Sequence, residues 1–345
     1  MTAKCPFTPG SESPRVINYL RKVIQRKYGM GKQLRVFHAK TIGVVKGTLT
    51  VPDLSSNKKL AIGLFKTEGV YDLAIRFTNG RSTVVPDGKT AVHGMAIKVM
   101  TPENEKYFDK SAKTQDIILS NVPVFYPYQP DAVYPSMKAI LAPGLIGVYY
   151  LVQVALKDFL AAVGFITSRK NSPNLLEEIY YSATPYKYGT KDKIKWSAWP
   201  SKVVCSVLPE SPHGDNFLTE RMRYDLDPDR SASPINDTVV NQPHESSEKT
   251  IDYRVKFTLC VQFQEDENTE PIEDCSVEWK TKFHPVGVIK IPAQHVEYKE
   301  NEGIDYGLWY SPANALEDHA PLGFVNLVRA QAYTTLARER LFPKP

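Results

Sequence analysis

Two segments of the chain, one near each end, place apolar residues at the spacing of an amphipathic helix. Within residues 14–29, one side of a helix would carry Val16, Ile17, Leu20, Val23 and Ile24. Gly29 and Gly31 follow this segment and favour a helix end there. Residues 324–341 show a similar helical pattern, directly after the helix-breaking sequence Pro321-Leu322-Gly323. We therefore predict an N-terminal helix over 14–29 and a C-terminal helix over 324–341.

Between these segments the apolar pattern has the period of two that is typical of β-strands. The clearest alternation lies in residues 251–264. Strands are predicted at 35–51, 70–78, 92–100, 116–119, 251–264, 276–281 and 286–291. Residues 172–200 are rich in Tyr, Pro and Lys and are predicted to be an irregular connection, and a helix is predicted near 219–224. Because no linker or repeat divides the chain, we predict one α+β domain over residues 1–345.

Residues 143–167 form the most apolar stretch of the chain. Its length approaches that of a membrane-spanning helix. Lys157 and Asp158 interrupt it, and Gln153 lies close by. A buried or interfacial helix is therefore the preferred interpretation, and a peripheral contact with a membrane stays open.

Composition narrows the function classes. The 345 residues are 42% hydrophobic and carry a net charge of +5, with Lys and Arg dispersed among acidic residues, which gives no footprint for nucleic acid. The cysteines are scattered and lack the spacing of a zinc site; they are Cys5, Cys205, Cys260 and Cys275. The first residues have no apolar core of a signal peptide, so we expect a cytoplasmic protein.

Several polar residues stand where they can form a site. His38 lies three residues after Arg35 in a strand-like pattern, and Asn121 ends a predicted strand just before Val-Pro. Arg329, Tyr333 and Arg340 are spaced to lie near one face of the C-terminal helix. A cation beside a tyrosine favours the phenolate, which is a good ligand for ferric haem. Each of these residues taken alone also has an ordinary structural explanation.

Taken together, these residues belong to a series of motifs that resembles the catalase-related haem proteins, in particular small members that lack the N-terminal arm and extra C-terminal domain of large catalases. The motifs follow in order as Arg35-Val36-Phe37-His38-Ala39-Lys40, Ile75-Arg76-Phe77-Thr78, His93-Gly94-Met95-Ala96-Ile97-Lys98, Ser120-Asn121-Val122-Pro123-Val124-Phe125, Tyr134-Pro135 and Arg329-x-x-x-Tyr333. The resemblance implies an antiparallel β-barrel surrounded by helices, with barrel strands within 35–121 and 202–292. Haem b would lie between the barrel and the C-terminal helix.

The resemblance assigns the side of the haem where peroxide would bind to three residues. His38 would be the base that takes a proton from the hydroperoxide and returns it to the leaving oxygen, work suited to imidazole near neutral pH. Asn121 would orient the peroxide by hydrogen bonding, and Thr78 would hold the histidine ring.

The resemblance assigns six further residues to cofactor binding. Tyr333 would be the axial metal ligand, and Arg329 would keep it anionic so that the iron supports O–O cleavage. The haem propionates would pair with Arg35, Arg76 and Arg340. Tyr134 would pack an aromatic ring near the haem.

Three departures from large catalases bear on the activity. His93 stands where they have arginine, which changes the charge near the pocket entrance. Phe37 replaces a smaller aliphatic residue before the distal histidine, and Thr334, Thr335 and Leu336 replace an expected Asp-Thr pair. These departures place hydrogen-peroxide turnover in doubt.

Four functions remain in view. We predict a peroxidase that reduces organic or fatty-acid hydroperoxides with an external electron donor. The alternatives within the resemblance are hydrogen-peroxide dismutation and rearrangement to an allene oxide, although the catalase-related synthase has threonine where this chain has Phe37. A different class is a β-barrel carrier whose arginines bind the carboxylate of a hydrophobic ligand. A homodimer stays open.

Overall fold

A closed antiparallel β-barrel forms the centre of the computed structural model, which describes residues 12–28, 35–101, 105–126, 132–142, 144–157, 163, 167, 169–201, 214–230, 251–296 and 307–341. Eight strands follow one another around the barrel in the order β5-β4-β3-β2-β1-β9-β8-β7. Pairing of β5 with β7 closes the ring, and β6 pairs with β7 as an addition to it. Closure removes the unpaired edges that an open sheet would expose.

The strands that build the barrel fall in two sequence blocks. The first contains β1 (Lys40–Val51), β2 (Gly69–Asn79), β3 (His93–Met100) and β4 (Thr114–Ser120). The second contains β5 (Tyr180–Tyr181), β6 (Tyr186–Tyr188), β7 (Asp192–Pro200), β8 (Tyr253–Phe263) and β9 (Phe283–Pro292).

The interior of the barrel is filled by every second side chain of each strand, as the pleat requires. In β8 these residues are Phe257, Leu259, Val261 and Phe263, each at most 1% exposed. Phe65 of the 3-10 turn Gly63–Phe65 and the ring of His319 pack with Trp196 inside the same core. The barrel is therefore a packed core, and the cavity described below lies at its rim.

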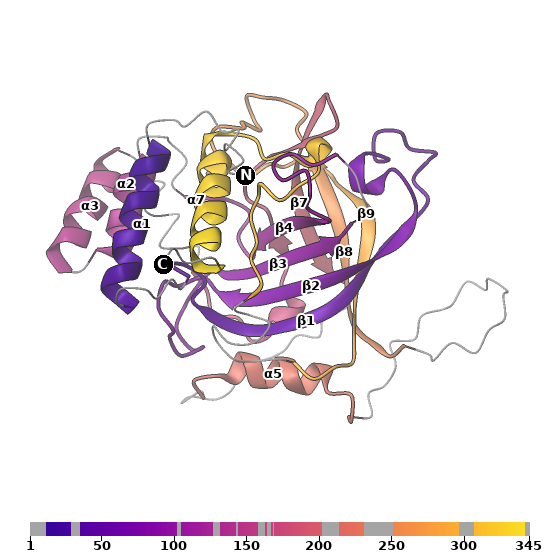
Figure 1. Cartoon of the computed structure of the whole chain (residues 1–345), viewed down its shortest axis with the longest axis horizontal. Coiled ribbons are helices and arrows are strands. Elements are labelled where there is room, and N and C mark those ends of the chain that lie inside the picture. Colours follow the sequence, from indigo (N-terminus) through magenta and orange to yellow (C-terminus); the bar gives the residue numbers. More distant parts are fainter. Residues whose placement is uncertain are drawn as a thin grey trace.

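Five helices of the described part of the chain surround the barrel. They are α1 (Glu12–Tyr28), α2 (Val133–Leu141), α3 (Gly144–Lys157), α5 (Phe217–Leu226) and α7 (Phe324–Leu341). Figure 1 shows α7 beside the barrel, α1 outside α7, and α2 with α3 at the outer edge, while α5 covers a different side. A second apolar cluster joins α1 to α7 and includes Val23, Val133 and Val328.

Most of the predicted elements are confirmed. The two terminal helices and the strands predicted at 70–78, 92–100, 116–119, 251–264 and 286–291 all form, with small shifts of their ends, and the helix near 219–224 is α5. The α+β class with an antiparallel barrel and surrounding helices is confirmed as well. Part of the predicted barrel block, residues 202–213 and 231–250, lies outside the described residues.

Three predictions of secondary structure are wrong. Residues 35–39 form a bend before β1, because His38 has a φ of +53°, which a strand does not allow. Residues 172–200 contain β5, β6 and β7, where tertiary pairing overrides the weak local pattern. Residues 276–281 form no strand, since Asp274 begins a turn with a side-chain bond to the Ser276 nitrogen at 2.9 Å.

The apolar stretch after position 143 forms α3, and most of that helix is exposed rather than buried. Leu145 is 86% exposed and Leu156 is 83% exposed. The prediction of a buried helix is therefore wrong, and an interfacial one stays open. Among the helices that the structure describes, none combines the length and the hydropathy needed to cross a lipid bilayer.

Candidate functional site

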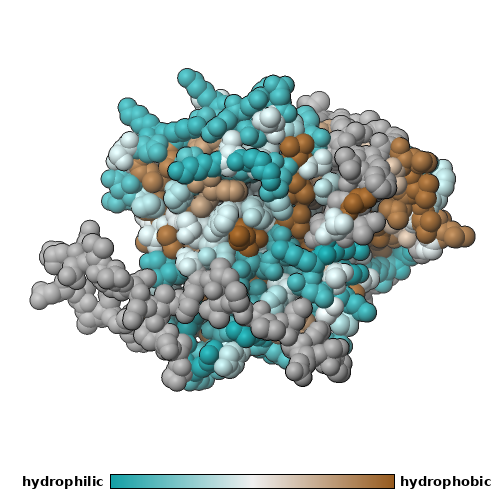
Figure 2. All heavy atoms as spheres, turned by 180° about the vertical axis from the view of Figure 1, so that it is seen from behind, coloured by the Kyte–Doolittle hydropathy of each residue, from teal (hydrophilic) through white to brown (hydrophobic). Residues whose placement is uncertain are grey.

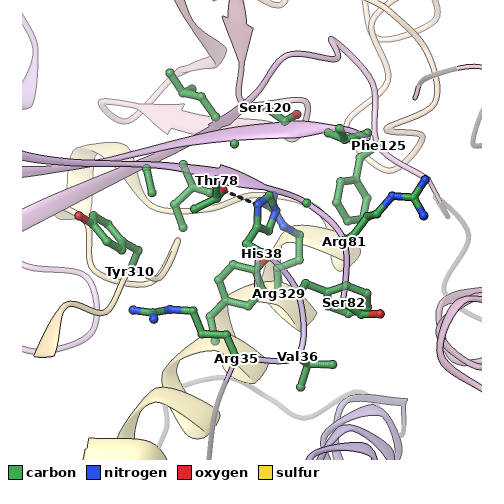
Figure 3. A pocket seen from close by; sticks show the side chains of 18 of the residues that line it. Arg35, Val36, His38, Thr78, Arg81, Ser82, Ser120, Phe125, Tyr310 and Arg329 are labelled. Carbon is green, nitrogen blue, oxygen red and sulfur yellow. Dashed lines mark hydrogen bonds between the residues drawn. The ribbon is translucent and has the colours of Figure 1, made fainter. Parts of the chain in front are cut away.

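A cavity of about 570 Å³ lies between the rim of the barrel and α7 (Figure 3). Strands β2, β3 and β4, helices α1, α2 and α7, and the segment before β1 all contribute to its wall. Its charged lining residues are Arg35, Arg76, Arg81, Arg169, Arg329 and Arg340. No acidic side chain lines it among the described residues. The cavity thus favours an anionic occupant with a large apolar surface.

His38 enters the cavity from the bend before β1. Its Nδ1 lies 2.7 Å from Oγ1 of Thr78, and Figure 3 shows this contact. Arg76 donates from Nη2 to the His38 carbonyl at 3.0 Å and to Thr41 Oγ1 at 2.7 Å. A positive φ is unusual for a residue other than glycine, so these bonds hold a backbone conformation that would otherwise relax.

A glycine opposite His38 makes room for the imidazole. A Cβ at Gly94 would lie 2.7 Å from His38 Cε1 and 2.7 Å from Thr78 Oγ1. Pairing of Thr78 with Gly94 in the β2–β3 ladder fixes this arrangement. The sequence motif His-Gly-Met therefore has a steric reason for its glycine at this position.

The His38 ring is held in its neutral form. Burial, and after it the positive charges of Arg76 and Arg329, lower the pKa of His38 to about 3. At neutral pH the imidazole therefore has a lone pair available. Because Nδ1 faces Thr78, the other ring nitrogen, Nε2, is the one left for a ligand in the cavity.

Arg329 and Tyr333 approach the same cavity from α7. The Arg329 guanidinium donates to Thr184 Oγ1 at 2.6 Å and lies 5.7 Å from the centroid of the Tyr333 ring. Burial lowers the pKa of Arg329, but the nearby Tyr333 and Tyr186 phenols outweigh it and raise that pKa overall. Arg329 therefore stays charged next to the phenol that a metal would require as phenolate.

Arg35 and Arg340 converge from opposite ends of the sequence on one carbonyl. Arg35 donates from Nη2 to Leu308 O at 2.7 Å, and Arg340 donates from Nη2 to the same atom at 2.8 Å. Arg76 lines the same cavity. Three guanidinium groups in one wall form a setting suited to carboxylates, which arginine binds in a bidentate manner.

Two residues predicted for the site do not line the cavity. The Asn121 amide accepts a bond from the His93 nitrogen at 2.8 Å and lies 3.4 Å from Glu178 Oε2. Tyr134 packs edge-on against Tyr19 between α1 and α2, at 5.7 Å between ring centroids. The neighbouring Ser120 does line the cavity.

His93 also lies elsewhere than predicted. It is fully buried and absent from the cavity wall, so it does not alter the charge at the entrance. Burial lowers the pKa of His93 to about 4, although Glu178 acts in the opposite direction. Although His93 does not line the cavity, its charge would help to lower the pKa of His38, which does.

Sequence reasoning missed two residues behind the cavity wall and two residues in it. Thr41 and Thr184 hold the guanidinium groups of Arg76 and Arg329, and nothing in their local sequence marks them. Arg81 lies three positions after Thr78, the last residue of a catalase-like motif. Its positive charge could have marked it as a residue of the site. Arg169 stands alone in a stretch without a motif, so only the tertiary structure brings it to the cavity.

Within the described residues no group of three or more His, Cys, Asp or Glu side chains is placed to hold a metal ion. Cys260 and Cys275 are buried free thiols, and Cys5 and Cys205 lie outside the described residues. A metal at this site would therefore depend on the phenol of Tyr333 and on a ligand supplied by a cofactor.

The fold is that of the catalases. A fungal catalase matches 99% of this chain at a TM-score of 0.64 and 14% identity. Catalase A from Saccharomyces cerevisiae matches 99% of this chain at a TM-score of 0.65 and 13% identity. A bacterial catalase matches 99% of it at a TM-score of 0.63 and 16% identity. The chain spans 66%, 68% and 63% of the length of these proteins.

The sequence itself carries a much weaker signal than the fold. No model of a known protein family matches the chain, and no curated protein sequence matches it. The likeness to the catalases is therefore a likeness of fold, in the arrangement of strands and helices.

Proposed function

We propose that the protein is a haem-dependent peroxidase that reduces organic or fatty-acid hydroperoxides, with Tyr333 as the ligand of a haem b iron. One observation carries the proposal. His38, held by Thr78 on the barrel, and Tyr333, beside Arg329 on α7, line a single cavity in a catalase fold. The pairing of an imidazole with a cation-supported phenol suits a catalase-type haem site.

The charges and the apolar side chains of the cavity wall support haem as its occupant. The guanidinium groups of Arg35, Arg76 and Arg340 would pair with the two propionates, and Arg329 would offset the charge of a Tyr333 phenolate. Apolar lining from Val36, Met95, Leu119, Phe125 and Leu336 would contact the porphyrin. When bound, ferric haem would supply the metal and the electrons for cleavage of the O–O bond.

The protein side chains would manage the proton. Neutral His38 would accept the hydroperoxide proton at Nε2 while Nδ1 donates to Thr78 Oγ1. The imidazolium that forms lies near Arg76 and Arg329, which disfavour its charge. The proton is therefore readily returned, to the oxygen that leaves as alcohol. An external donor would supply the two electrons that each reduction of a hydroperoxide consumes, and so return the enzyme to its starting state.

The other functions of this cavity rest on weaker observations. Dismutation of hydrogen peroxide and rearrangement to an allene oxide would use the same His38 and Tyr333. A carrier of a hydrophobic carboxylate would use the arginines alone and would not need the contact between His38 and Thr78. That 2.7 Å contact is why we place the enzyme ahead of the carrier.

The proposal is tested by colour, spectrum and products. The purified protein should bind haem and show the high-spin ferric spectrum of phenolate ligation. Tyr333→Phe should lose most of the haem, whereas the matched control Tyr224→Phe, at an exposed tyrosine of α5, should keep it. His38→Ala should keep haem and lose hydroperoxide cleavage.

Two results would reject the proposal. One is a protein that takes up no haem during expression or reconstitution. The other is a His38→Ala variant with undiminished cleavage. Product analysis distinguishes the reactions: an alcohol formed only with a reducing donor supports the peroxidase, oxygen release from hydrogen peroxide supports dismutation, and an allene oxide supports isomerisation.

A further inference from the structure

An exposed apolar stripe runs along the outer face of α3. Its side chains follow one another at helical spacing and each is at least half exposed; they are Leu145, Val148, Tyr149, Val152 and Leu156. Helix α3 lies at the outer edge of the molecule in Figure 1, and Figure 2 shows brown side chains gathered at that edge, seen from behind. A contiguous apolar patch on a water-facing helix indicates a binding surface.

The opposite face of α3 packs inward, which holds the stripe in a fixed orientation. Val154 is buried on this inner face, and Gly147 lies seven positions before it, on the same side of the helix. A Cβ at Gly147 would lie 2.7 Å from the Ala142 carbonyl oxygen and 3.3 Å from that of Ala139. The missing side chain therefore lets the α3 backbone approach the end of α2, and the stripe is left facing water.

Direct contacts place one cation between α2 and α3. Lys138 of α2 donates from Nζ to the Tyr150 hydroxyl of α3 at 2.9 Å. The same Nζ lies 4.6 Å from the centroid of the Tyr150 ring and 5.0 Å from that of the Tyr134 ring. Hydrogen bonds with these two hydroxyl groups raise the pKa of Lys138. Because these partners are hydroxyl groups and not carboxylates, they leave the positive charge of the ammonium group uncancelled.

Two ring contacts connect this cation to the apolar stripe. The Tyr150 ring meets the Tyr149 ring edge-on, at 5.2 Å between centroids, and Tyr149 belongs to the stripe. Gln153 donates to the Tyr149 hydroxyl at 2.7 Å. The ammonium group of Lys138 thus lies within roughly one Debye length of the Tyr149 ring, which is about 10 Å at 0.1 M salt. Its charge therefore acts on any surface that the stripe touches.

The partner of the stripe has to be apolar where it meets α3 and negative beside it. The sequences of α2 and α3 contain two charged residues, Lys138 and Lys157, and both are positive. A second copy of this surface would bring further positive charge instead of negative charge. An anionic phospholipid surface offers acyl chains beneath a layer of phosphate groups, so it meets both requirements.

We propose that α3 docks in the interfacial region of an anionic phospholipid bilayer and lies along the surface. The leucines and valines of the stripe enter the boundary of the acyl chains, and Lys138 lies near the phosphate groups. The rings of Tyr149 and Tyr150 suit the same depth, because tyrosine is enriched where the bilayer meets water. Lysine also suits it, since its apolar stem reaches past the rings while the ammonium group stays hydrated.

Helix α2 connects this surface with the cavity. Met137 and Ile140 line the cavity, whereas Lys138 reaches toward α3. Docking of α3 would therefore bring an apolar part of the cavity wall close to the lipid. One consequence rests on the proposed peroxidase function: a fatty-acid hydroperoxide dissolved in the bilayer would reach His38 through this side of the cavity.

Vesicle sedimentation tests the apolar part of the docking surface. The full chain should bind vesicles that contain phosphatidylglycerol, and bind pure phosphatidylcholine vesicles more weakly. Leu145→Gln/Leu156→Gln should lower the affinity for the phosphatidylglycerol vesicles by about tenfold or more, because two leucines no longer enter the interface. The matched control Val70→Gln/Ile251→Gln removes two exposed apolar side chains outside the helices and should bind like the wild type.

The same assay tests the cation. Lys138→Gln should lower the affinity for phosphatidylglycerol vesicles by about fivefold and leave that for phosphatidylcholine vesicles unchanged. Lys138→Arg retains the charge and should bind like the wild type. Lys66→Gln, at an exposed lysine after the turn Gly63–Phe65, is the matched control and should not weaken binding.

Fluorescence shows which residues meet the lipid. Val152→Trp places an indole in the middle of the stripe, at a side chain that is 50% exposed. Its emission should be quenched by brominated acyl chains in phosphatidylglycerol vesicles. The emission of Val70→Trp should not be quenched, and equal quenching of the two variants would contradict docking through α3.

Turnover separates this inference from the proposed function. With linoleic acid hydroperoxide dissolved in phosphatidylglycerol vesicles, Leu145→Gln/Leu156→Gln should reduce the hydroperoxide more slowly than the wild type. The same variant should reduce cumene hydroperoxide in solution at the wild-type rate. Failure of the peroxidase proposal is seen separately, because the wild type would then reduce neither substrate while its binding to vesicles persisted.

Three results would overturn the lipid proposal. The first is equal binding of the wild type to the two kinds of vesicle. The second is binding to phosphatidylglycerol vesicles that neither Leu145→Gln/Leu156→Gln nor Lys138→Gln weakens. The third is absence of vesicle binding; a wild-type dimer that the leucine variant converts into a monomer would then make a second copy of the chain the partner of α3.

Discussion

The Nδ1 atom of His38 lies 2.7 Å from Oγ1 of Thr78, and this contact links the bend before β1 to the edge of β2. The bond sets the direction of the imidazole, and Gly94 leaves the space for it. Together with the Arg76 bond to the His38 carbonyl, it fixes both the backbone and the ring of the proposed base.

Removal of the Thr78 hydroxyl should slow catalysis without removing haem. Thr78→Val keeps the side-chain volume and loses a hydrogen bond worth about 1 kcal/mol, which corresponds to roughly fivefold in rate. Stopped-flow measurement of hydroperoxide cleavage should show this loss at unchanged haem content. Thr78→Ser retains a hydroxyl and should stay close to the wild type; an equally slow Thr78→Ser would contradict the role of the bond.

A methyl group at Gly94 should disturb the same pair. The added Cβ of Gly94→Ala would lie 2.7 Å from His38 Cε1 and from Thr78 Oγ1, so the ring must move. We expect a loss of about 1–3 kcal/mol in the free energy of unfolding and slower hydroperoxide cleavage. The control is Gly214→Ala, where the nearest atom would be 4.0 Å from the Cβ. Similar effects in both variants would argue against a specific fit.

Stability should fall in mild acid because three histidines are buried in neutral form. Burial lowers the pKa to about 3 for His38, about 4 for His93 and about 3 for His319. Below pH about 6.5 the unfolded chain binds protons that the folded chain does not. The free energy of unfolding is therefore highest above that pH and declines as the pH falls toward about 4.

The decline should amount to about 1.4 kcal/mol per pH unit for each histidine. Urea unfolding at pH values between roughly 7.5 and 4.5 measures this decline in the free energy of unfolding. His319→Phe should keep the ring packing against Tyr188 and Trp196 and reduce the slope by about one third. An unchanged slope in this variant would show that His319 is protonated equally in both states.

Loss of one partner from the buried pair of Lys98 and Asp116 should destabilise the cavity wall. Their side chains meet at 2.5 Å, and Asp116 Oδ2 also accepts the Ser311 nitrogen at 2.9 Å. Lys98→Met should cost about 3–5 kcal/mol, since it leaves a buried carboxylate without its cation. Thermal unfolding measures this cost.

The double variant Lys98→Met/Asp116→Asn serves as the comparison for this pair. It removes both charges, so it should recover part of the lost stability while an amide oxygen still accepts the Ser311 nitrogen. A double variant that loses as much stability as the two single variants together would contradict the charge argument. Trp309 and Tyr310, which directly precede Ser311 in the chain, line the cavity and should loosen in the single variant.

The sequence by itself determined many of the regular elements and several residues that line the cavity. The helical period gave α1 and α7, and the alternation of β8 gave a barrel strand, because burial on one face forces these periods on the residues. Arg329 and Tyr333 could be placed together because four positions on a helix share a face. The ordered motifs resembling catalases brought His38, Thr78 and Arg76 into one expected site.

Only the tertiary structure decided the remaining features. The bend at His38 depends on the distant Arg76 and Gly94, and the strands within 172–200 form through pairing with β4 and β8. The amide of Asn121 is directed by His93 and Glu178, and Arg169 reaches Arg81 through the pairing of Lys170 with Ala91. Local periodicity does not predict such partners, because each depends on contacts between residues far apart in the chain.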